Sequence, residues 1–221
     1  MRRRLTILLL LVPGISSLPT SGQDASKVVH SPIYGKFTGT LKLSPVGDGI
    51  HMTVLEAISY DDGLRHELDV PANFETDGAS IPRALWTIVG SPFSGGNYVE
   101  AAVIHDEGCV SHKYDWQTTH MMFYRAMIDS GVSEHYAKLL YYGVRLGGPR
   151  WEEVATGPPG SFGKTGGSTT LEEVLPPVIT SPDLTNKLKE FDSELKKSEA
   201  AGHPISIRTI DKRTVGPDNT P

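Results

Sequence analysis

Three consecutive helical segments in the middle of the chain most constrain its fold. They run over about residues 97–110, 115–130 and 133–148. Asp115 and Ser133 stand at the start of the second and third segments, where helices favour such N-cap residues. Few charged residues interrupt the segments, so none of them has a face suited to full exposure to water. We expect the three helices to be buried against one another or against a sheet.

The region before these helices has the pattern of β-strands. Residues 37–43 (FTGTLKL), 50–60 (IHMTVLEAISY) and 65–74 (RHELDVPANF) alternate in part between apolar and polar side chains and are rich in β-branched and aromatic types. The stretches between them, SPVGDG and DDG, are typical of turns. We therefore predict an α+β fold, in which a small N-terminal antiparallel sheet packs against about three buried helices.

The first 22 residues have the layout of a secretory signal peptide. Three arginines precede an apolar run from Leu5 to Val12, and a small and polar stretch follows up to Gly22. The apolar run is far shorter than the ~20 residues that span a bilayer as a helix. We predict cleavage after Gly22 and an exported protein, periplasmic or secreted, with no transmembrane span after processing.

The charge of the processed chain argues against nucleic-acid binding. Loss of residues 1–22 removes three arginines and no acids, which leaves 18 Lys and Arg against 26 Asp and Glu, a formal charge of −8. Sequence-independent binding to nucleic acids relies on Lys and Arg at the phosphates, so we expect no nucleic-acid partner. Cys109 is the only cysteine, which excludes an internal disulfide, so stability must come from a packed core.

Composition divides the processed chain into three parts. Residues 30–152 hold the predicted sheet and helices and form the α+β domain. Residues 153–182 are rich in Gly, Pro and Ser, as is typical of a flexible linker. Residues 183–221 form an appendage: a helix over about 183–200, then a short strand at ISIRTI or a tail. The apolar residues of this helix fall on one narrow stripe: Leu184, Leu188, Phe191 and Leu195. The helix could therefore dock on the domain or contact a partner in the cell envelope.

Two histidines are predicted to face each other between the first two helices. His105 shares a helical stripe with Cys109, and His120 shares one with Trp116 and Phe123. A connection of about four residues favours an antiparallel helix pair, which places His105 and His120 at the same level. A neutral imidazole can act as a general base. The candidate catalytic site therefore consists of His105, Asp106 and His120, with His105 as the base and His120 as the partner that orients it.

Other polar residues near this pair offer further chemistry. Asp106 points about 100° away from His105 along the helix, so it is a candidate cation ligand or an anchor that supports the site. Cys109 could supply a thiolate in an electropositive site, or it could be a small buried apolar residue. A zinc site formed from His105, Cys109, His112 and His120 is an alternative. A divalent cation, calcium or zinc, could also use Asp106, although the sequence requires no cofactor.

Several motifs, in order along the chain, resemble those of one protein family. They are VPANFETDGASIPRALW, GNYVEAAVIHDEG, FYRAM and YYGVRLGG. Over about residues 36–151 the chain resembles bacterial and phage proteins known as domain of unknown function 1353, a name that implies no activity. Members usually carry an aspartate in the second helix, where this chain has His120. The resemblance therefore implies that a His–Asp pair across the helices has become a His–His pair here.

The turn that begins at Asp77 belongs to this shared pattern and has two interpretations. Asp77, Ser80 and Arg83 could line a cleft where the sheet meets the helices and support the site. Alternatively, Asp77 and Ser80 bond to backbone N–H groups and Arg83 pairs with a surface acid. We favour the second interpretation, because each of these side chains has a local task in a turn.

The pair His105-Asp106 is also similar in layout to secreted phospholipases of the A2 type, in which the histidine is the base for a water and the aspartate holds calcium. Only these two residues match, because the facing aspartate and the cystines of those enzymes are absent. Our functional hypothesis is a hydrolase acting on lipid or cell-wall substrates. The alternative is a non-catalytic binding domain, or an envelope or phage-type structural domain, in which the same residues form a satisfied polar pair in the core.

Overall fold

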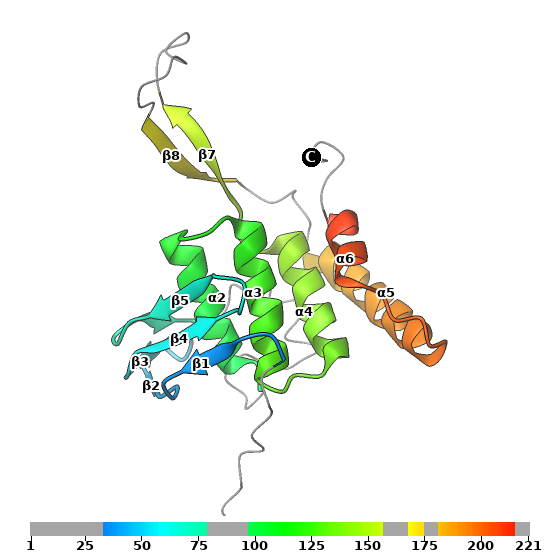
Figure 1. The fold of residues 1–221 in the computed structure, drawn as a ribbon, viewed down its shortest axis with the longest axis horizontal. Helices are drawn as coiled ribbons and strands as arrows, with labels where there is room; N and C mark the ends of the chain where they lie inside the picture. Colours follow the sequence, from blue (N-terminus) through cyan, green and yellow to red (C-terminus); the bar gives the residue numbers. More distant parts are fainter. Residues whose placement is uncertain (1–32, 79–96, 157–167, 175–180, 215–221) are drawn as a thin grey trace, which may run out of the picture.

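The computed structural model of the chain describes residues 33–78, 97–156, 168–174 and 181–214 (Figure 1). Within these ranges it contains small antiparallel sheets and five α-helices, which confirms the predicted α+β class. The predicted signal peptide and two residues of the predicted turn, Ser80 and Arg83, lie outside the described residues. None of the described helices is both long enough and apolar enough to cross a membrane.

Six short strands form two three-stranded antiparallel sheets. They are β1 (Lys36–Thr38), β2 (Leu43–Pro45), β3 (Met52–Val54), β4 (Ile58–Asp61), β5 (Glu67–Val70) and β6 (Glu75–Thr76). One sheet has the order β1-β4-β5 and the other the order β2-β3-β6. The first two predicted segments therefore bend and contribute one strand to each sheet, instead of running straight through a single sheet. The third segment contributes β5 to one sheet, and β6 follows directly after it in the other. Two of the bends contain residues with positive φ, Gly39 (88°) and Asn73 (68°), where regular strand geometry ends.

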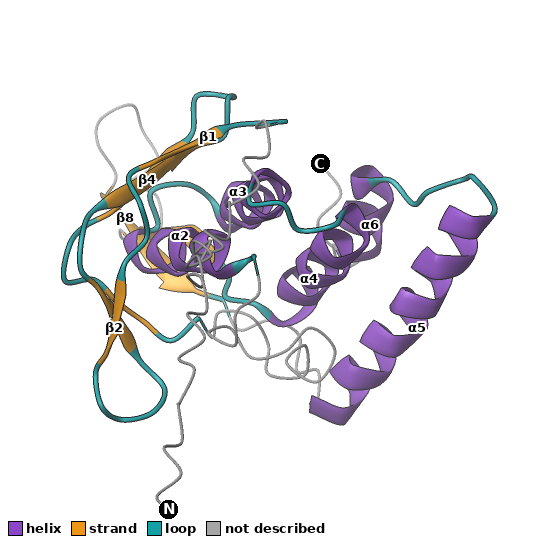
Figure 2. Cartoon of the chain, turned by 90° about the horizontal axis from the view of Figure 1, so that it is seen from below, coloured by secondary structure: helices purple, strands orange, loops and turns teal. Residues whose placement is uncertain are grey.

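The three predicted helices are present with the predicted caps. They are α2 (Val99–Ser111), α3 (Trp116–Asp129) and α4 (Glu134–Gly147). The Asp115 carboxylate accepts a hydrogen bond from the backbone N–H of Thr118 at 2.7 Å, and the Ser133 hydroxyl accepts one from Tyr136 at 3.4 Å. In sequence order the helices lie progressively further from the strands, with α2 against β5 and β6 and α3 between α2 and α4 (Figure 2).

One continuous core runs from the strands to the last helices. Its largest fully buried side chains come from all of these layers: Tyr60, Leu68, Ile104, Met122, Phe123, Met127, Leu139, Leu140, Tyr141 and Leu188. A Cβ atom added to Gly108 of α2 would lie 2.7 Å from Cγ2 of Thr119 and 2.9 Å from Cδ1 of Leu68. Because Gly108 has no side chain, α2 can approach both α3 and β5 closely at this level.

The segment predicted as a linker, residues 153–182, begins and ends differently from the prediction. β7 (Trp151–Thr156) pairs antiparallel with β8 (Ser168–Glu173) and forms a hairpin that stands away from the helices (Figure 1). Residues 157–167 and 175–180 lie outside the described residues. The linker interpretation is therefore wrong for the two strands. Their pairing rests on backbone hydrogen bonds between strands, so the Gly- and Pro-rich composition between them did not reveal it.

The predicted C-terminal helix docks on the domain. α5 (Ser181–Ala200) packs against α4 and buries all four apolar residues of the predicted stripe. The rings of Tyr142 and Phe191 lie 4.2 Å apart in this contact. His135 of α4 adds a polar contact, because its Nε2 lies 2.8 Å from a carboxylate oxygen of Asp192.

The short strand predicted at ISIRTI is instead the start of a helix, α6 (Ile207–Thr214). The Ser206 hydroxyl accepts a hydrogen bond from the backbone N–H of Thr209 at 3.2 Å and caps this helix. Ile205 precedes the cap and Ile210 follows it by four residues, and both are buried, which is the arrangement of a hydrophobic staple. The apparent alternation of isoleucines therefore reflects a capped helix start, and the strand prediction is wrong.

Candidate functional site

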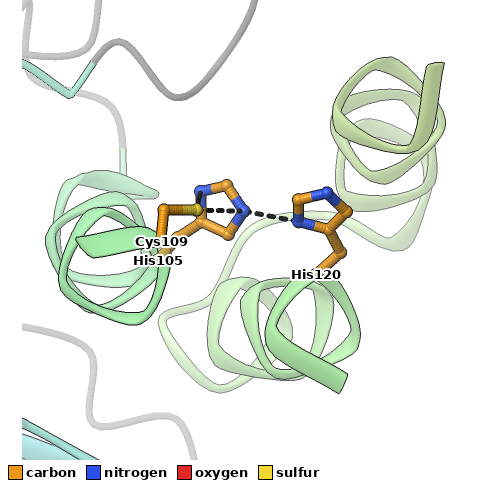
Figure 3. A group of neighbouring side chains, drawn as sticks. All are labelled: His105, Cys109 and His120. Atoms are coloured by element: carbon orange, nitrogen blue, oxygen red, sulfur yellow. Dashed lines mark hydrogen bonds between the residues drawn. The ribbon is translucent and has the colours of Figure 1, made fainter. Parts of the chain in front are cut away.

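The two histidines that were predicted to face each other are in contact between α2 and α3. Nε2 of His105 lies 2.8 Å from Nδ1 of His120, and both side chains are fully buried (Figure 3). Residues 112–115 connect the two helices, so the helices run antiparallel and bring the rings to the same level, as the spacing predicted. At this distance one imidazole donates a hydrogen bond to the other. Their chemical role stays a prediction.

Aromatic side chains surround the pair. The ring of Phe123 lies 4.7 Å from the ring of His105, and the ring of Trp116 meets that of His120 at 5.5 Å with an edge contact. These apolar walls shield the contact between the two imidazoles from bulk water. Burial of this kind disfavours a charged ring.

The pKa values follow from this environment. Burial lowers the pKa of His105 to about 3. Burial also lowers the pKa of His120 well below its usual value, and repulsion from His105 when that ring is protonated, and from Arg145 and Arg150, lowers it further. The carbonyl of Pro149 acts in the opposite direction and raises this pKa. Both rings are therefore neutral at neutral pH, and a single proton lies in the contact between them.

The hydrogen bond between the two rings can run in either direction. In one of these directions Nε2–H of His105 donates to Nδ1 of His120, whose Nε2 then carries the proton of that ring. Nδ1 of His105 is then the unprotonated nitrogen that can accept a proton.

Cys109 lies one turn from His105 but does not point between the two rings. Its sulfur is 3.9 Å from Nδ1 and 3.7 Å from Nε2 of His105. Nearly equal distances to both nitrogens place the sulfur over the ring rather than on the line of either lone pair. The Cys109 side chain is partly exposed, so the thiol lies between the buried pair and the outside.

The same three residues are the candidate metal ligands. One ligand atom from each of His105, Cys109 and His120 lies within 4.8 Å of the others. Two nitrogens bound to one tetrahedral zinc ion lie about 3.3 Å apart, whereas here they are 2.8 Å apart. To hold zinc, the imidazoles would have to separate and the thiol would have to turn toward the gap. The present arrangement fits a hydrogen-bonded pair better than a metal site.

Asp106 points away from the pair and ties α2 to the turn after β6. Its Oδ2 atom accepts hydrogen bonds from the hydroxyl of Thr76 and from the backbone N–H of Gly78, the latter at 3.0 Å. Gly78 has a positive φ of 58°, which suits glycine in such a turn. Both predicted roles of Asp106, cation ligand and anchor of the site, stay predictions. Asp77 is half-buried in the same turn. Thr76 lies within the shared motif VPANFETDGASIPRALW, but its contact with Asp106 was not predicted from the sequence.

The structure does not bring His112 to the other candidate ligands. His112 is the C-cap of α2 with a φ of 51°, and its ring stacks on that of Trp151 at 4.5 Å. The four-residue zinc site predicted from His105, Cys109, His112 and His120 is therefore not assembled. The left-handed backbone at the helix end turns this side chain toward the hairpin instead.

Sequence reasoning missed a group of cationic residues beside His120. The guanidinium carbons of Arg145 and Arg150 lie 4.5 Å and 4.7 Å from the centre of the Trp116 ring. Arg145 is in the last turn of α4 and Arg150 follows that helix, so they lie far from His120 in sequence. The motif YYGVRLGG contained Arg145, but nothing in its spacing indicated a contact with α3.

Two cavities that are lined by described residues lie elsewhere on the molecule. One, of about 410 Å³, is lined by residues that include Tyr34, Tyr124 and Val132. The other, of about 220 Å³, is lined by residues that include His112 and Trp151. Neither is lined by His105 or His120, so neither cavity leads to the buried pair.

Comparison with known proteins identifies the family. A family model described as a protein of unknown function (DUF1353) matches residues 52–144. The chain is 34% identical over 177 residues to the uncharacterized protein y4iH of Sinorhizobium fredii. This aligned region covers 77% of this chain and 73% of that relative. It is 36% identical over 122 residues to the uncharacterized protein y4jT of the same organism. This second aligned region covers 52% of this chain and 36% of that relative. No solved structure gives a significant match. The resemblance seen in the motifs is confirmed, and the chain belongs to the DUF1353 family of proteins of unknown function.

Proposed function

We propose that this protein is a hydrolase in which His105 is the general base and His120 orients it. The observation that carries the proposal is the 2.8 Å contact between Nε2 of His105 and Nδ1 of His120, made by two neutral rings in an apolar layer. A base whose second nitrogen is held by a partner is the arrangement that many hydrolases share.

In the proposed reaction, Nδ1 of His105 removes a proton from water as the water oxygen forms a bond to the electrophilic centre of the substrate. The hydrogen bond from Nε2–H to His120 holds the ring in place and spreads the positive charge that develops. The bond to the leaving group then breaks, and protonated His105 returns the proton to that group. Asp106 is a positioning residue in this scheme, because it holds the turn at Thr76 and Gly78 against α2.

The proposed substrates are lipids or cell-wall polymers, which an exported protein meets. Export is supported by the arginines and the apolar run within residues 1–22. Expression of the full chain in a bacterial cell tests it. Recovery outside the cytoplasm with a mass that lacks about the first 22 residues is expected, and retention of the full mass in the cytoplasm would contradict export.

A non-catalytic role for the same residues is the second candidate. It is favoured by the complete burial of both rings, which share one hydrogen bond. A buried polar pair of this kind helps to fix how two helices pack. In that case His105 and His120 stabilise an envelope-structural or binding domain.

Substitution of the base separates the two candidates. Wild type, His105→Gln and His120→Gln are tested against phospholipid vesicles, peptidoglycan and simple aryl esters, with the exposed His203→Gln as a matched control. We expect kcat/KM to fall by about 10²–10⁴-fold in His105→Gln, as is usual for loss of a general base, and to stay within twofold in the control. A wild type with no hydrolysis of any substrate, together with a lower melting temperature in both variants, would favour the structural role.

A further inference from the structure

Arg145 and Arg150, at the C-terminal end of α4, both pack against the ring of Trp116. The guanidinium carbons of Arg145 and Arg150 are 4.5 Å and 4.7 Å from the centre of the Trp116 ring, the first residue of α3. Arg145 is only 2% exposed, whereas Arg150 is half-buried. A guanidinium on an aromatic face gains a modest attraction to the electron-rich face of the ring. That gain alone is small against the cost of removing two like charges from water.

The carboxylates among the described residues offset only one of these charges. Nε of Arg145 lies 3.7 Å from a carboxylate oxygen of Asp211 and donates a hydrogen bond to the Thr214 hydroxyl at 3.1 Å. Arg150 donates from Nη2 to the carbonyl oxygen of Arg145 at 2.5 Å. Within the part of the chain that the structure describes, no carboxylate pairs with Arg150, and its buried Nε has no hydrogen-bond partner. One positive charge is therefore left without a counter-charge here.

A second polar group beside Trp116, in addition to Arg150, has no hydrogen-bond partner among the described residues. Nε2 of His120 is buried and has no hydrogen bond of normal geometry to any described residue. Figure 3 shows this nitrogen turned away from His105. The Trp116 ring links the two sides of this group, because it contacts the ring of His120 and both guanidinium groups. Buried groups of this kind normally have a partner, so their grouping points to a ligand.

We infer that Arg145, Arg150 and Nε2 of His120 form a binding site for the phosphate group of a phosphate ester. Guanidinium groups bind phosphate oxygens in pairs of hydrogen bonds, and the imidazole N–H can donate to a third oxygen. Because Arg150 is half-buried and Arg145 is not exposed, the ligand enters past Arg150. Phosphate binding stands by itself, whereas the role of this phosphate as a handle for the substrate rests on the proposed hydrolase.

A bound phosphate would also act on the histidine pair. The positive charges of Arg145 and Arg150 now help to hold the pKa of His120 down. A phosphate anion between them offsets these charges, so a proton taken up by His105 becomes less costly. Binding of a phosphorylated substrate would therefore strengthen the base at the moment when it is needed.

Direct titration of the full chain with inorganic phosphate tests the site. Calorimetry measures the affinity, and tryptophan fluorescence reports on Trp116. We expect Arg150→Gln to raise the Kd for phosphate at least tenfold. Arg125→Gln is the matched control, because Arg125 is also half-buried on an aromatic ring, at 4.6 Å from Tyr34, with an unpartnered Nε. Its Kd should stay within twofold of wild type.

Two further measurements keep the proposal open to refutation. Arg150→Lys keeps the charge, so it should fold and bind phosphate with intermediate affinity even if Arg150→Gln unfolds. Titration with glycerol phosphate and with vesicles of phosphatidylglycerol distinguishes a soluble ester from a lipid headgroup, since both carry the required group. No phosphate binding by wild type, or equal loss in the Arg150 and Arg125 variants, would overturn the site.

The outcome is distinguishable from that of the hydrolase proposal. Phosphate binding that depends on Arg150, in a protein that hydrolyses none of the substrates, would support the phosphate site and contradict the hydrolase proposal. Hydrolysis that depends on His105, with no binding of phosphate, would do the reverse.

Discussion

The buried histidine pair should make the fold sensitive to mild acid. An unfolded histidine has a pKa of about 6.5, whereas burial holds the pKa of His105 at about 3 and that of His120 well below its usual value. Below pH 6.5 the unfolded chain therefore binds protons that the folded chain does not. The stability contributed by the two neutral rings is present above that pH and is lost as the pH falls toward the folded-state pKa values.

The size of the loss follows from the linkage relation. For a histidine that stays neutral when folded, a change from pH 7.5 to pH 5.0 lowers the free energy of unfolding by about 2 kcal/mol. Two such residues lower it by about 4 kcal/mol. This is a large part of the roughly 5–15 kcal/mol that typically separates folded from unfolded protein.

Urea unfolding followed by circular dichroism at pH 7.5, 6.5, 5.5 and 5.0 measures this loss. Other groups also titrate, so the test compares wild type with His120→Gln and with the double variant His105→Gln/His120→Gln. The single variant should lose about 2 kcal/mol less than wild type over this pH range and the double variant about 4 kcal/mol less. The exposed His203→Gln should lose as much as wild type. Equal losses in all four proteins would refute the assignment of two neutral buried rings.

Three other predictions follow from the described contacts. The Asp129 carboxylate accepts hydrogen bonds from the backbone N–H groups of residues 33–35 and from the buried Tyr60 hydroxyl, a set of contacts that we call the Asp129 clamp. Asp129→Ala should therefore lower the free energy of unfolding by about 3–5 kcal/mol and the melting temperature by about 10 °C. A decrease of less than about 1 kcal/mol would show that the clamp contributes little to stability. Burial raises the pKa of Tyr60, Tyr124 and Tyr141 above the usual value, so stability should fall above pH 10 by about 1.4 kcal/mol per pH unit for each ring, which unfolding curves at pH 10 and 11 measure. Because the two imidazole nitrogens lie closer together than zinc ligands do, elemental analysis of the purified protein should find well under one zinc ion per chain, and one tightly held zinc would show that the cluster rearranges around the metal.

The helices and the meeting of the two histidines could be predicted because the signals are local. Asp115 and Ser133 mark helix starts by bonds to residues three positions away. The short connection between α2 and α3 then fixes their direction, and direction together with spacing fixes which of their residues lie at the same level. The division of the strands into two sheets could not be read in this way. The bends at Gly39 and Asn73 depend on backbone angles, and the side-chain pattern around them continues.

The contacts that complete the candidate site have no local signal. Arg145 and Arg150 reach Trp116 only because α4 packs beside α3, and their spacing along the chain is unremarkable for a helix end. The Asp129 clamp likewise joins residues more than 90 positions apart. Such contacts are consequences of the packing and become visible only when the packing is known.

The family resemblance implies an aspartate where this chain has His120, and this difference changes what His105 would need to act as the proposed base. An aspartate partner carries a fixed negative charge that stabilises a protonated His105, whereas neutral His120 offers none, and Arg145 and Arg150 oppose protonation. If the inferred phosphate supplies the missing charge, phosphate should reduce the acid sensitivity of the fold. Repeating the pH series in phosphate and in chloride at equal ionic strength tests this link. We expect the loss of stability from pH 7.5 to 5.0 to be smaller in phosphate for wild type and unchanged for Arg150→Gln. The same loss in both salts for wild type would mean that the anion and the histidine pair act independently.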